Sequence, residues 1–163
     1  MTRPLGLLLL LTLGATGCGR LADRRFDRIA REATARDTAV YLTPFGAPTR
    51  PFSPAVRVGN LLLLAGQIGT TGADATGALV PGGIEAETRQ TMENIRTVLA
   101  AVGSSMDKVV KCTVMMADMS EWDRMNAVYR TYFAPGRLPA RSALGANGLA
   151  LGARVEIECF ATR

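Results

Sequence analysis

The chain contains no histidine among its 163 residues, and this absence restricts the chemistry that its side chains can carry out. It excludes catalytic triads that use histidine as the base, and it excludes zinc, iron and copper sites with histidine ligands. Proton transfer near neutral pH must therefore fall to a carboxylate, a tyrosine, a lysine or a cysteine.

Arg141 and Glu156 are the charged residues whose surroundings are most distinctive. Arg141 lies in the segment Pro-Ala-Arg-Ser, and Glu156 is the first glutamate of Val-Glu-Ile-Glu. From residue type alone, the two side chains could form a structural ion pair between strands or subunits, or each could simply be solvated. A functional role for them therefore depends on the motifs in which they stand.

The formal net charge of +5 and the pI of about 9.6 suggest an acidic partner such as nucleic acid. The excess positive charge, however, lies near the N-terminus. Residues 18–50 carry +3, whereas residues 51–163 carry eleven basic and ten acidic groups. Aromatic residues make up only 6% of the chain, too few and too scattered for a base-stacking platform. We therefore expect no nucleic-acid partner.

Residues 1–17 have the pattern of an export signal. Arg3 is followed by an apolar stretch, Leu5–Leu13, which is too short to span a membrane but has the length of the apolar part of a secretory signal. The next residues, Ala-Thr-Gly-Cys, resemble a bacterial lipobox, which predicts that Cys18 is lipidated and begins an exported, membrane-anchored protein. An ordinary cleaved signal, with Cys18 incidental, is the alternative.

Residues 18–51 are predicted to be a basic tether between this anchor and a folded domain. Apolar residues at helical spacing alternate with arginines, which indicates either a short solvated helix or an amphipathic helix on anionic headgroups. Thr43–Pro51 is rich in proline and glycine and marks the expected domain boundary.

Residues 52–163 are predicted to form an α+β domain in which two helices pack on one mixed sheet, in the order ββ(β)αβαββ. A glycine-rich loop is expected at residues 69–83, with Gly103 ending the first helix and Ser120 capping the second. Strands are expected at residues 55–58, 61–65, 108–116, 141–145 and 154–161, and helices at 84–102 and 121–133.

The two remaining cysteines, Cys112 and Cys159, lie in predicted strands and are expected to be buried thiols. Export would permit a disulfide between them, and this alternative stays open because the sequence does not show whether they are adjacent.

The domain resembles the Rid family of reactive-intermediate imine and enamine deaminases over about 112 residues. The most specific matches are Leu138–Ser142 and Val155–Glu158, whose Arg141 and Glu156 are 15 positions apart, as in the family. Further matching segments are residues 51–56, 59–60, 65–67, 87–94, 109–111, 125–129 and 132–133.

The resemblance implies a homotrimer of a chorismate-mutase-like fold, with sites in clefts between neighbouring subunits and with no metal or cofactor. It assigns Arg141 to binding of the substrate carboxylate and Glu156 to orienting water or relaying protons. Gly66 would contribute backbone to the pocket, and Asn126 would lie close to it. A guanidinium recognises a carboxylate by two parallel hydrogen bonds, which suits this assignment.

Three departures from the family pattern lie around the implied pocket. Phe52 stands where members usually carry tyrosine, so a hydroxyl that can order water or substrate is missing. Ala143 replaces a frequent cysteine, at a position that often acts through its backbone. Residues 147–152 replace the usual Arg-Leu-Pro loop, which should alter the mouth of the pocket.

The implied activity is hydrolysis of 2-imino or 2-enamino acids to 2-oxo acids and ammonia, with the substrate bound between copies of the chain. Such imines already hydrolyse in water, so orientation and one carboxylate suffice as catalyst. The alternatives are a non-catalytic binding protein for small carboxylates that uses the same Arg141, and a holdase-like trimeric scaffold. Ribonuclease activity, ascribed to some relatives, is disfavoured by the nearly neutral domain.

Overall fold

The computed structural model describes residue 28 and residues 38–47, 49–72 and 77–163. Thr38–Arg163 is one compact unit, and of the unit Met1–Asp37 only Arg28 is described. The predicted signal, the lipidation site Cys18 and most of the predicted tether therefore lie outside the described residues. Within the described ranges, no helix combines the length and the apolar character needed to cross a bilayer.

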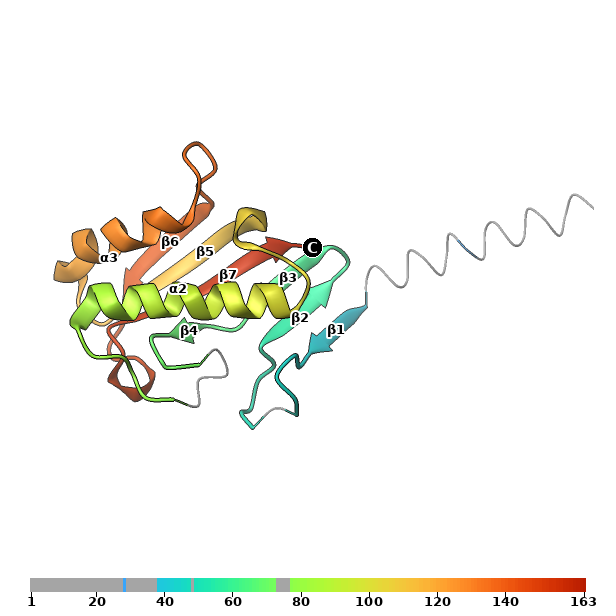
Figure 1. Ribbon diagram of the computed structural model, residues 1–163, viewed down its shortest axis with the longest axis horizontal. Coiled ribbons are helices and arrows are strands. Elements are labelled where there is room, and N and C mark those ends of the chain that lie inside the picture. Colours follow the sequence, from blue (N-terminus) through green and yellow to red (C-terminus); the bar gives the residue numbers. More distant parts are fainter. Residues whose placement is uncertain (1–27, 29–37, 48, 73–76) are drawn as a thin grey trace, which may run out of the picture. The chain divides into compact units, whose positions relative to one another are not determined.

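Thr38–Arg163 is built on a mixed β-sheet with strand order β1-β2-β3-β7-β5-β6, with β4 also paired to β7 (Figure 1). The β5–β6 pairing is parallel, and the other pairings are antiparallel. The strands are β1 Ala39–Leu42, β2 Ala55–Val58, β3 Leu61–Leu64, β4 Gln67–Ile68, β5 Val109–Met116, β6 Ala140–Gly145 and β7 Val155–Thr162.

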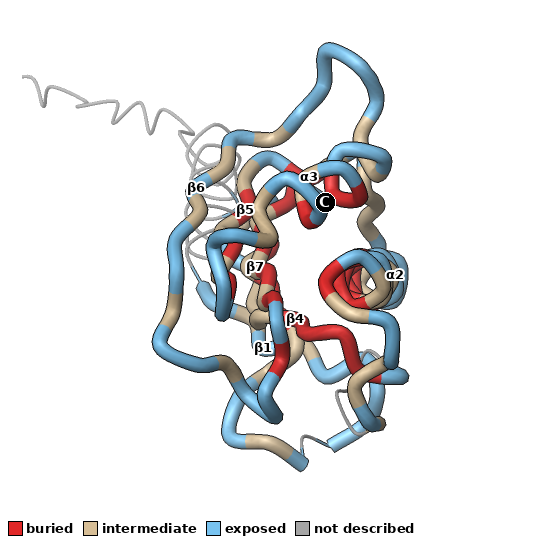
Figure 2. Tube along the Cα trace, turned by 90° about the vertical axis from the view of Figure 1, so that its left-hand side faces the viewer, coloured by how far each residue is buried: buried red, intermediate tan, exposed pale blue. Residues whose placement is uncertain are grey.

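Two α-helices lie on the same side of the sheet: α2, Gly83–Ala101, and α3, Trp122–Tyr129 (Figure 2). Short 3-10 turns occur at Met106–Lys108, Met119–Glu121, Arg130–Tyr132 and Ala150–Gly152. Two helices on one mixed sheet confirm the predicted α+β class.

The longer helix is positioned by a stripe of apolar and small side chains at helical spacing. Ile84, Thr88, Met92, Ile95 and Leu99 are fully buried, and they recur every three or four residues so that they share one face. Gly103 has a φ of +79°, which glycine adopts without steric cost, and the helix ends just before it. Both the stripe and the stop agree with the sequence prediction.

The sheet has one face under the helices and one face that they leave open. Along β7 the residues alternate between buried and half-buried, and β5 follows the same alternation from Cys112 onward. The buried set packs with α2 and α3 in the core, and the alternate set lies on the open face. Side chains on adjacent strands therefore meet only when they share a face.

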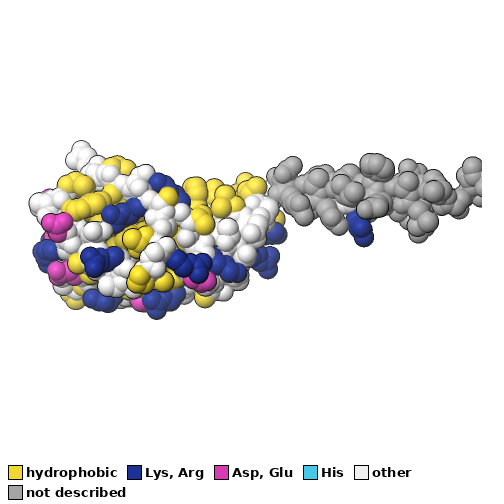
Figure 3. Space-filling model, turned by 90° about the horizontal axis from the view of Figure 1, so that it is seen from above, with side chains coloured by type: hydrophobic (Ala, Val, Ile, Leu, Met, Phe, Trp, Pro, Cys, Tyr) yellow, Lys and Arg dark blue, Asp and Glu magenta, His cyan; other side chains and the backbone are white. Residues whose placement is uncertain are grey.

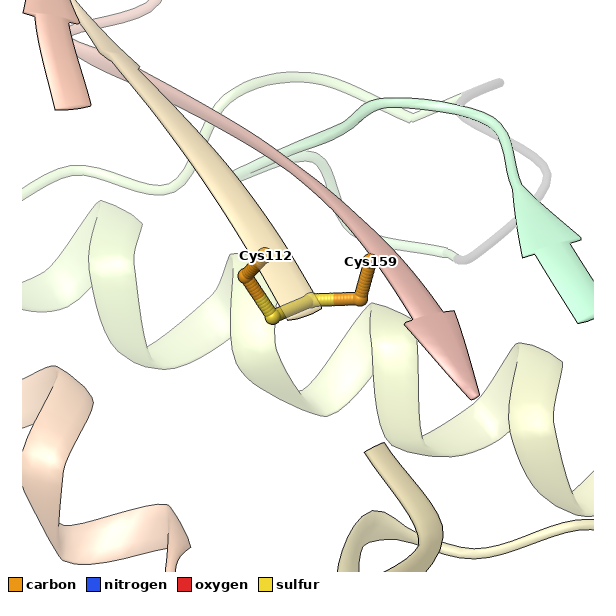
Figure 4. The surroundings of a disulfide bond; sticks show 2 residues. All are labelled: Cys112 and Cys159. Carbon is orange, nitrogen blue, oxygen red and sulfur yellow. A yellow bond between two sulfur atoms is a disulfide. The ribbon is translucent and has the colours of Figure 1, made fainter. Parts of the chain in front are cut away.

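Cys112 and Cys159 are joined by a disulfide, so the expectation of free thiols is wrong (Figure 4). The two residues face each other in the antiparallel β5–β7 pair, with their Cα atoms 4.1 Å apart, and both are fully buried. They are 47 positions apart in the chain, so only the strand register brings them together.

Two local features differ from the sequence prediction. Strand β1 lies within residues 18–51, the range predicted as a tether, and pairs with β2 along its whole length. Ser120 does not cap α3. Its backbone N–H instead donates to the carboxylate of Asp118 at 2.8 Å, so Asp118 caps the 3-10 turn that precedes α3.

Several residues of the 87–94 motif have a structural role. Asn94 Nδ2 donates hydrogen bonds to the carbonyl oxygens of Ile68 at 3.0 Å and Thr70 at 2.9 Å, which fixes β4 against α2. The buried carboxylate of Glu87 accepts the backbone N–H of Arg154 at 2.8 Å. These contacts hold the end of β4 and the segment that leads into β7, and two predicted site residues lie nearby in the chain: Gly66 directly before β4 and Glu156 on β7.

Candidate functional site

Arg141 lies on the edge strand β6, and its side chain is directed toward α3. Its Nη1 donates a hydrogen bond to Asn126 Oδ1 at 2.8 Å. Its Cζ lies 4.8 Å from the ring centroid of Trp122 and 4.7 Å from that of Tyr129. Arg141, Asn126, Trp122 and Tyr129 together form what we call the arginine cluster.

The helical period explains why one guanidinium contacts three side chains of α3. Trp122, Asn126 and Tyr129 occupy positions i, i+4 and i+7 and therefore form a single stripe on the helix. Within the described part of the chain, no carboxylate forms an ion pair with Arg141. Its charge is met by two ring faces and one amide oxygen, which leaves the cation able to bind an anion.

Tyr129 is the most buried member of the arginine cluster, with 3% of its surface exposed. Burial raises the pKa of its phenol to about 12, against the opposing effect of the Arg141 charge. The hydroxyl has no hydrogen-bond partner among the described residues. The ring of this residue, rather than its hydroxyl, therefore contacts Arg141.

Glu156 lies on β7, on the open face of the sheet, where Met115 of β5 and Ile68 of β4 are its neighbours in register. It is half-buried, and this burial raises the pKa of its carboxyl above the ordinary value of 4.5. The negative charge of Glu158, two residues along on the same face, raises that pKa further. Glu156 thus keeps a proton to higher pH than an exposed glutamate does.

Gly66 lies against the carboxylate of Glu156, so the structure brings these two predicted site residues together. A Cβ at position 66 would overlap Glu156 Oε1 and would lie 3.0 Å from Glu156 Cδ. Glycine therefore leaves the room that the carboxylate occupies. We call Glu156, Glu158 and Gly66 the glutamate cluster.

The structure divides the predicted site residues of one chain into separate groups. Arg141 on β6 is in register with Cys112 on β5, which is in register with Cys159 on β7. Glu156 lies three residues before Cys159 on β7, and its side chain is on the other face of the sheet. Strand spacing and rise put the Cα atoms of Arg141 and Glu156 about 14 Å apart. Among the described residues no ion pair joins them, so the structural pairing that residue type alone allowed does not occur within one chain.

The other two predicted positions also differ in their placement. Ala143 lies two residues beyond Arg141 on β6, opposite the buried Val114, and packs against the core on the same face. Phe52 precedes β2 and is 48% exposed. Strands β3, β7 and β5 separate β2 from β6 (Figure 1), so Phe52 and Arg141 lie toward opposite edges of the sheet.

Sequence reasoning assigned no contact with Arg141 to Trp122 or Tyr129, so it missed both contacts. The signal that would have found them is their spacing around Asn126 on the predicted helix. It also missed Glu158 as a neighbour of Glu156, which the alternation of a strand predicts.

Neither a metal site among the described residues nor a continuous basic surface on the face drawn in Figure 3 stands out. No group of three or more histidine, cysteine, aspartate or glutamate residues that could hold a metal ion occurs in the described ranges. On the face shown in Figure 3, basic side chains are scattered among apolar, acidic and neutral ones.

The fold and the two clusters define an α+β protein in which, among the described residues, an arginine without a carboxylate partner lies on one face of a mixed sheet and a glutamate of raised pKa lies on the other. A family model described as Endoribonuclease L-PSP matches residues 44–163. A mouse protein named 2-iminobutanoate/2-iminopropanoate deaminase is 42% identical over 113 residues, which cover 69% of this chain and 82% of that protein.

Solved structures agree with the sequence match. The yeast protein YEO7 superposes with a TM-score of 0.69 at 34% identity, covering 77% of this chain and 99% of its own. The Rid-family protein YyfA from Yersinia pestis gives a TM-score of 0.68 at 36% identity, covering 77% and 100%. The chain belongs to the Endoribonuclease L-PSP family, which includes the Rid proteins.

Proposed function

We propose that the chain hydrolyses 2-imino and 2-enamino acids to 2-oxo acids and ammonia. The observation that carries the proposal is the arginine cluster: a guanidinium held by two rings and an amide, with no carboxylate partner in the described residues. A guanidinium in this state is a receptor for a carboxylate. The mouse relative is named for deaminating two imino acids of this class.

The proposed reaction uses the two clusters for different tasks. Arg141 binds the substrate carboxylate and so fixes the C=N carbon relative to Glu156. Protonated Glu156 gives its proton to the carbon of an enamine or to the nitrogen of an imine, and its carboxylate then accepts a proton from the attacking water. Glu156 then gives this proton to the nitrogen and takes up the hydroxyl proton as the C=O bond forms and ammonia leaves, so that one water is consumed for each ammonia released.

This division of tasks requires a second copy of the chain. Within one chain the two clusters lie on opposite faces, about 14 Å apart, and a small imino acid cannot span that distance through the sheet. Large apolar side chains are exposed near both edges, Tyr41 and Phe52 near one and Leu138 and Leu144 near the other, as expected of surfaces that another subunit covers. We propose a homotrimer in which one subunit supplies Arg141 and a neighbour supplies Glu156.

The trimer can be tested by mixing two inactive variants. Arg141→Ala and Glu156→Gln are unfolded together and refolded, because a mixed trimer then contains some sites with both native residues. Recovery of activity in the mixture, with a trimeric mass by light scattering, supports the proposal. No recovery from correctly sized mixed trimers contradicts it.

We also propose that the protein is exported and anchored through Cys18. The residues before Cys18 support this, and so does the core disulfide, because disulfides persist in oxidising compartments and are rare in reducing ones. Cys18→Ser should abolish lipid labelling and move the protein from the membrane to the soluble fraction. An unchanged distribution would contradict the anchor.

The activity is tested by supplying an amino-acid oxidase that generates a 2-imino acid, trapping the imine with semicarbazide and following the release of 2-oxo acid. The wild type should accelerate release and Arg141→Ala should not. A second function, binding of small carboxylates without turnover, is favoured by the arginine cluster alone. It would be indicated by Arg141-dependent binding of 2-oxobutanoate without any acceleration.

A further inference from the structure

The guanidinium of Arg141 is held more completely than binding to a carboxylate alone requires. It has five N–H donors, and Asn126 accepts one of them at Nη1. Trp122 and Tyr129 are two helical turns apart, about 10.5 Å along the axis, and each ring centroid lies less than 5 Å from Cζ. The cation therefore fits between the two rings.

We propose that Trp122 and Tyr129 are positioning residues, which orient Arg141 so that its free N–H edge receives the substrate carboxylate. This inference rests on the proposed deaminase function and adds the residues that determine the affinity for its substrate. The rings restrict the tilt of the guanidinium plane, and the Asn126 amide restricts its rotation within that plane. The N–H donors of Arg141 that Asn126 does not engage are left for the carboxylate of the ligand.

Aromatic partners suit this task better than an acidic partner would. An aspartate or glutamate beside Arg141 would occupy the same N–H edge that the substrate needs, and it would neutralise the charge that attracts it. Ring faces stabilise a cation without using any of its donors. The absence of an acidic partner in the described residues thus has a functional reason.

The hydroxyl of Tyr129 makes a sharp distinction possible. It is buried, and it has no hydrogen-bond partner among the described residues, so it contributes no polar contact to Arg141. Tyr129→Phe keeps the ring and removes only this hydroxyl, so as the conservative variant it should retain the fold and most of the substrate affinity. Tyr129→Leu removes the ring and should weaken substrate binding.

The chain offers a matched control outside the site. Tyr132 stacks on Arg96 with Cζ 5.1 Å from its ring centroid, and it belongs to the turn directly after α3. Tyr132→Leu thus removes the same kind of cation–ring contact, close in sequence, without touching Arg141. Any effect that it shares with Trp122→Leu reflects packing rather than positioning.

The kinetic test compares these variants in the full-length chain, in detergent, at equal folded fraction. Trp122→Leu and Tyr129→Leu should each raise KM by about tenfold with little change in kcat, because the substrate carboxylate is bound before the reaction. Trp122→Phe and Tyr129→Phe, which keep a ring beside Arg141, should restore most of the affinity that the leucine variants lose, and Tyr132→Leu, outside the cluster, should leave KM unchanged. Equal changes in Trp122→Leu and Tyr132→Leu, or an unchanged KM in Trp122→Leu, would overturn the proposal.

A second readout keeps the inference separate from the proposed reaction. The Nε–H signal of Arg141 in the NMR spectrum, identified by its loss in Arg141→Lys, should be displaced by the ring currents of its neighbours. Trp122→Leu should move it toward the position of a free arginine, and Tyr132→Leu should not. If the signal does not move in Trp122→Leu, the positioning role fails whatever the activity. If it moves but the wild type releases no 2-oxo acid, only the deaminase function fails.

Discussion

The arginine and glutamate clusters lie on opposite faces of one sheet and are constructed differently. The arginine cluster is completed within one chain, by a hydrogen bond and two ring contacts from a single helix stripe. The glutamate cluster relies on burial and on the repulsion of a like charge, with Gly66 leaving space beside the carboxylate. On the proposed function, recognition of the ligand is thus preorganised within one chain, whereas in the homotrimer that we propose the geometry for proton transfer depends on a neighbouring copy.

This difference between the clusters predicts that substitution of Arg141 has the largest effect on activity. Arg141→Ala should lower kcat/KM by about 10²- to 10³-fold, because the substrate carboxylate then lacks its charged partner. Arg141→Lys should recover little, since an ammonium cannot reproduce the planar pair of hydrogen bonds or the contact with both rings. The measurement is the imine-trapping assay.

Arg124→Ala is the control for Arg141, because it removes an arginine that lies on α3 itself and pairs with Glu85 on the surface. Its kcat/KM should match that of the wild type. A similar loss in both variants would mean that net charge, rather than the arginine cluster, determines activity.

The disulfide joins β7, the strand that carries Glu156, to β5, which lies between β7 and the Arg141 strand β6. Reduction should lower the free energy of unfolding by about 2 to 4 kcal/mol, because the unfolded chain is no longer constrained across 47 positions. We expect the melting temperature to fall in reductant, while KM at 25 °C stays unchanged, since no contact of Arg141 passes through the sulfur atoms.

The double variant Cys112→Ala, Cys159→Ala should be less stable than the oxidised wild type and insensitive to reductant. If reduction instead raises KM while the protein remains folded, the arginine cluster is not self-contained and the contrast between the two clusters weakens.

The sequence predicts the parts of this arrangement that are local in the chain. The stripes of α2 and α3 and most strand ranges follow from periodicity, and the neighbourhood of Arg141 and Asn126 follows from the family motifs. Strand partners and register are not local. The pairing of Cys112 with Cys159 and the contribution of β1 to the sheet arise only when distant segments dock. The face on which each site residue lies follows from the same docking.

Gly66→Ala should disturb the glutamate cluster while leaving the arginine cluster intact. The added Cβ would overlap Glu156 Oε1, so the carboxylate or the backbone has to move. We expect kcat to fall by about 10- to 100-fold, with a much smaller change in the affinity for 2-oxobutanoate, measured by titration calorimetry.

Gly145→Ala is the control for Gly66, because its Cβ would approach only the flexible side chain of Met119, at 3.1 Å. It should leave kcat close to that of the wild type. A parallel loss of kcat and ligand affinity in Gly66→Ala would show that the two clusters are not separable.

The smallest effect is expected from Glu158, which acts on the pKa of Glu156 through its charge alone. Burial, the larger cause, remains in Glu158→Gln, so the pKa of Glu156 should fall but stay above 4.5. Because a raised pKa in the folded state favours the protonated form, the stability that Glu156 contributes is present below the unfolded pKa and is lost as the pH rises through the folded one. In Glu158→Gln this loss should occur at lower pH.

The pH dependence of kcat/KM tests the same shift, since its Glu156-dependent limb should move to lower pH in Glu158→Gln while the maximal rate changes little. Glu85→Gln, which removes an equal charge on α2, should leave the limb in place. A limb that moves to higher pH, or that moves equally in both variants, would mean that Glu158 does not act on Glu156. The proton affinity of the glutamate cluster would then be determined by burial alone, and the contrast with the arginine cluster, whose cation is held by two rings and an amide, would rest on solvent exclusion rather than on repulsion.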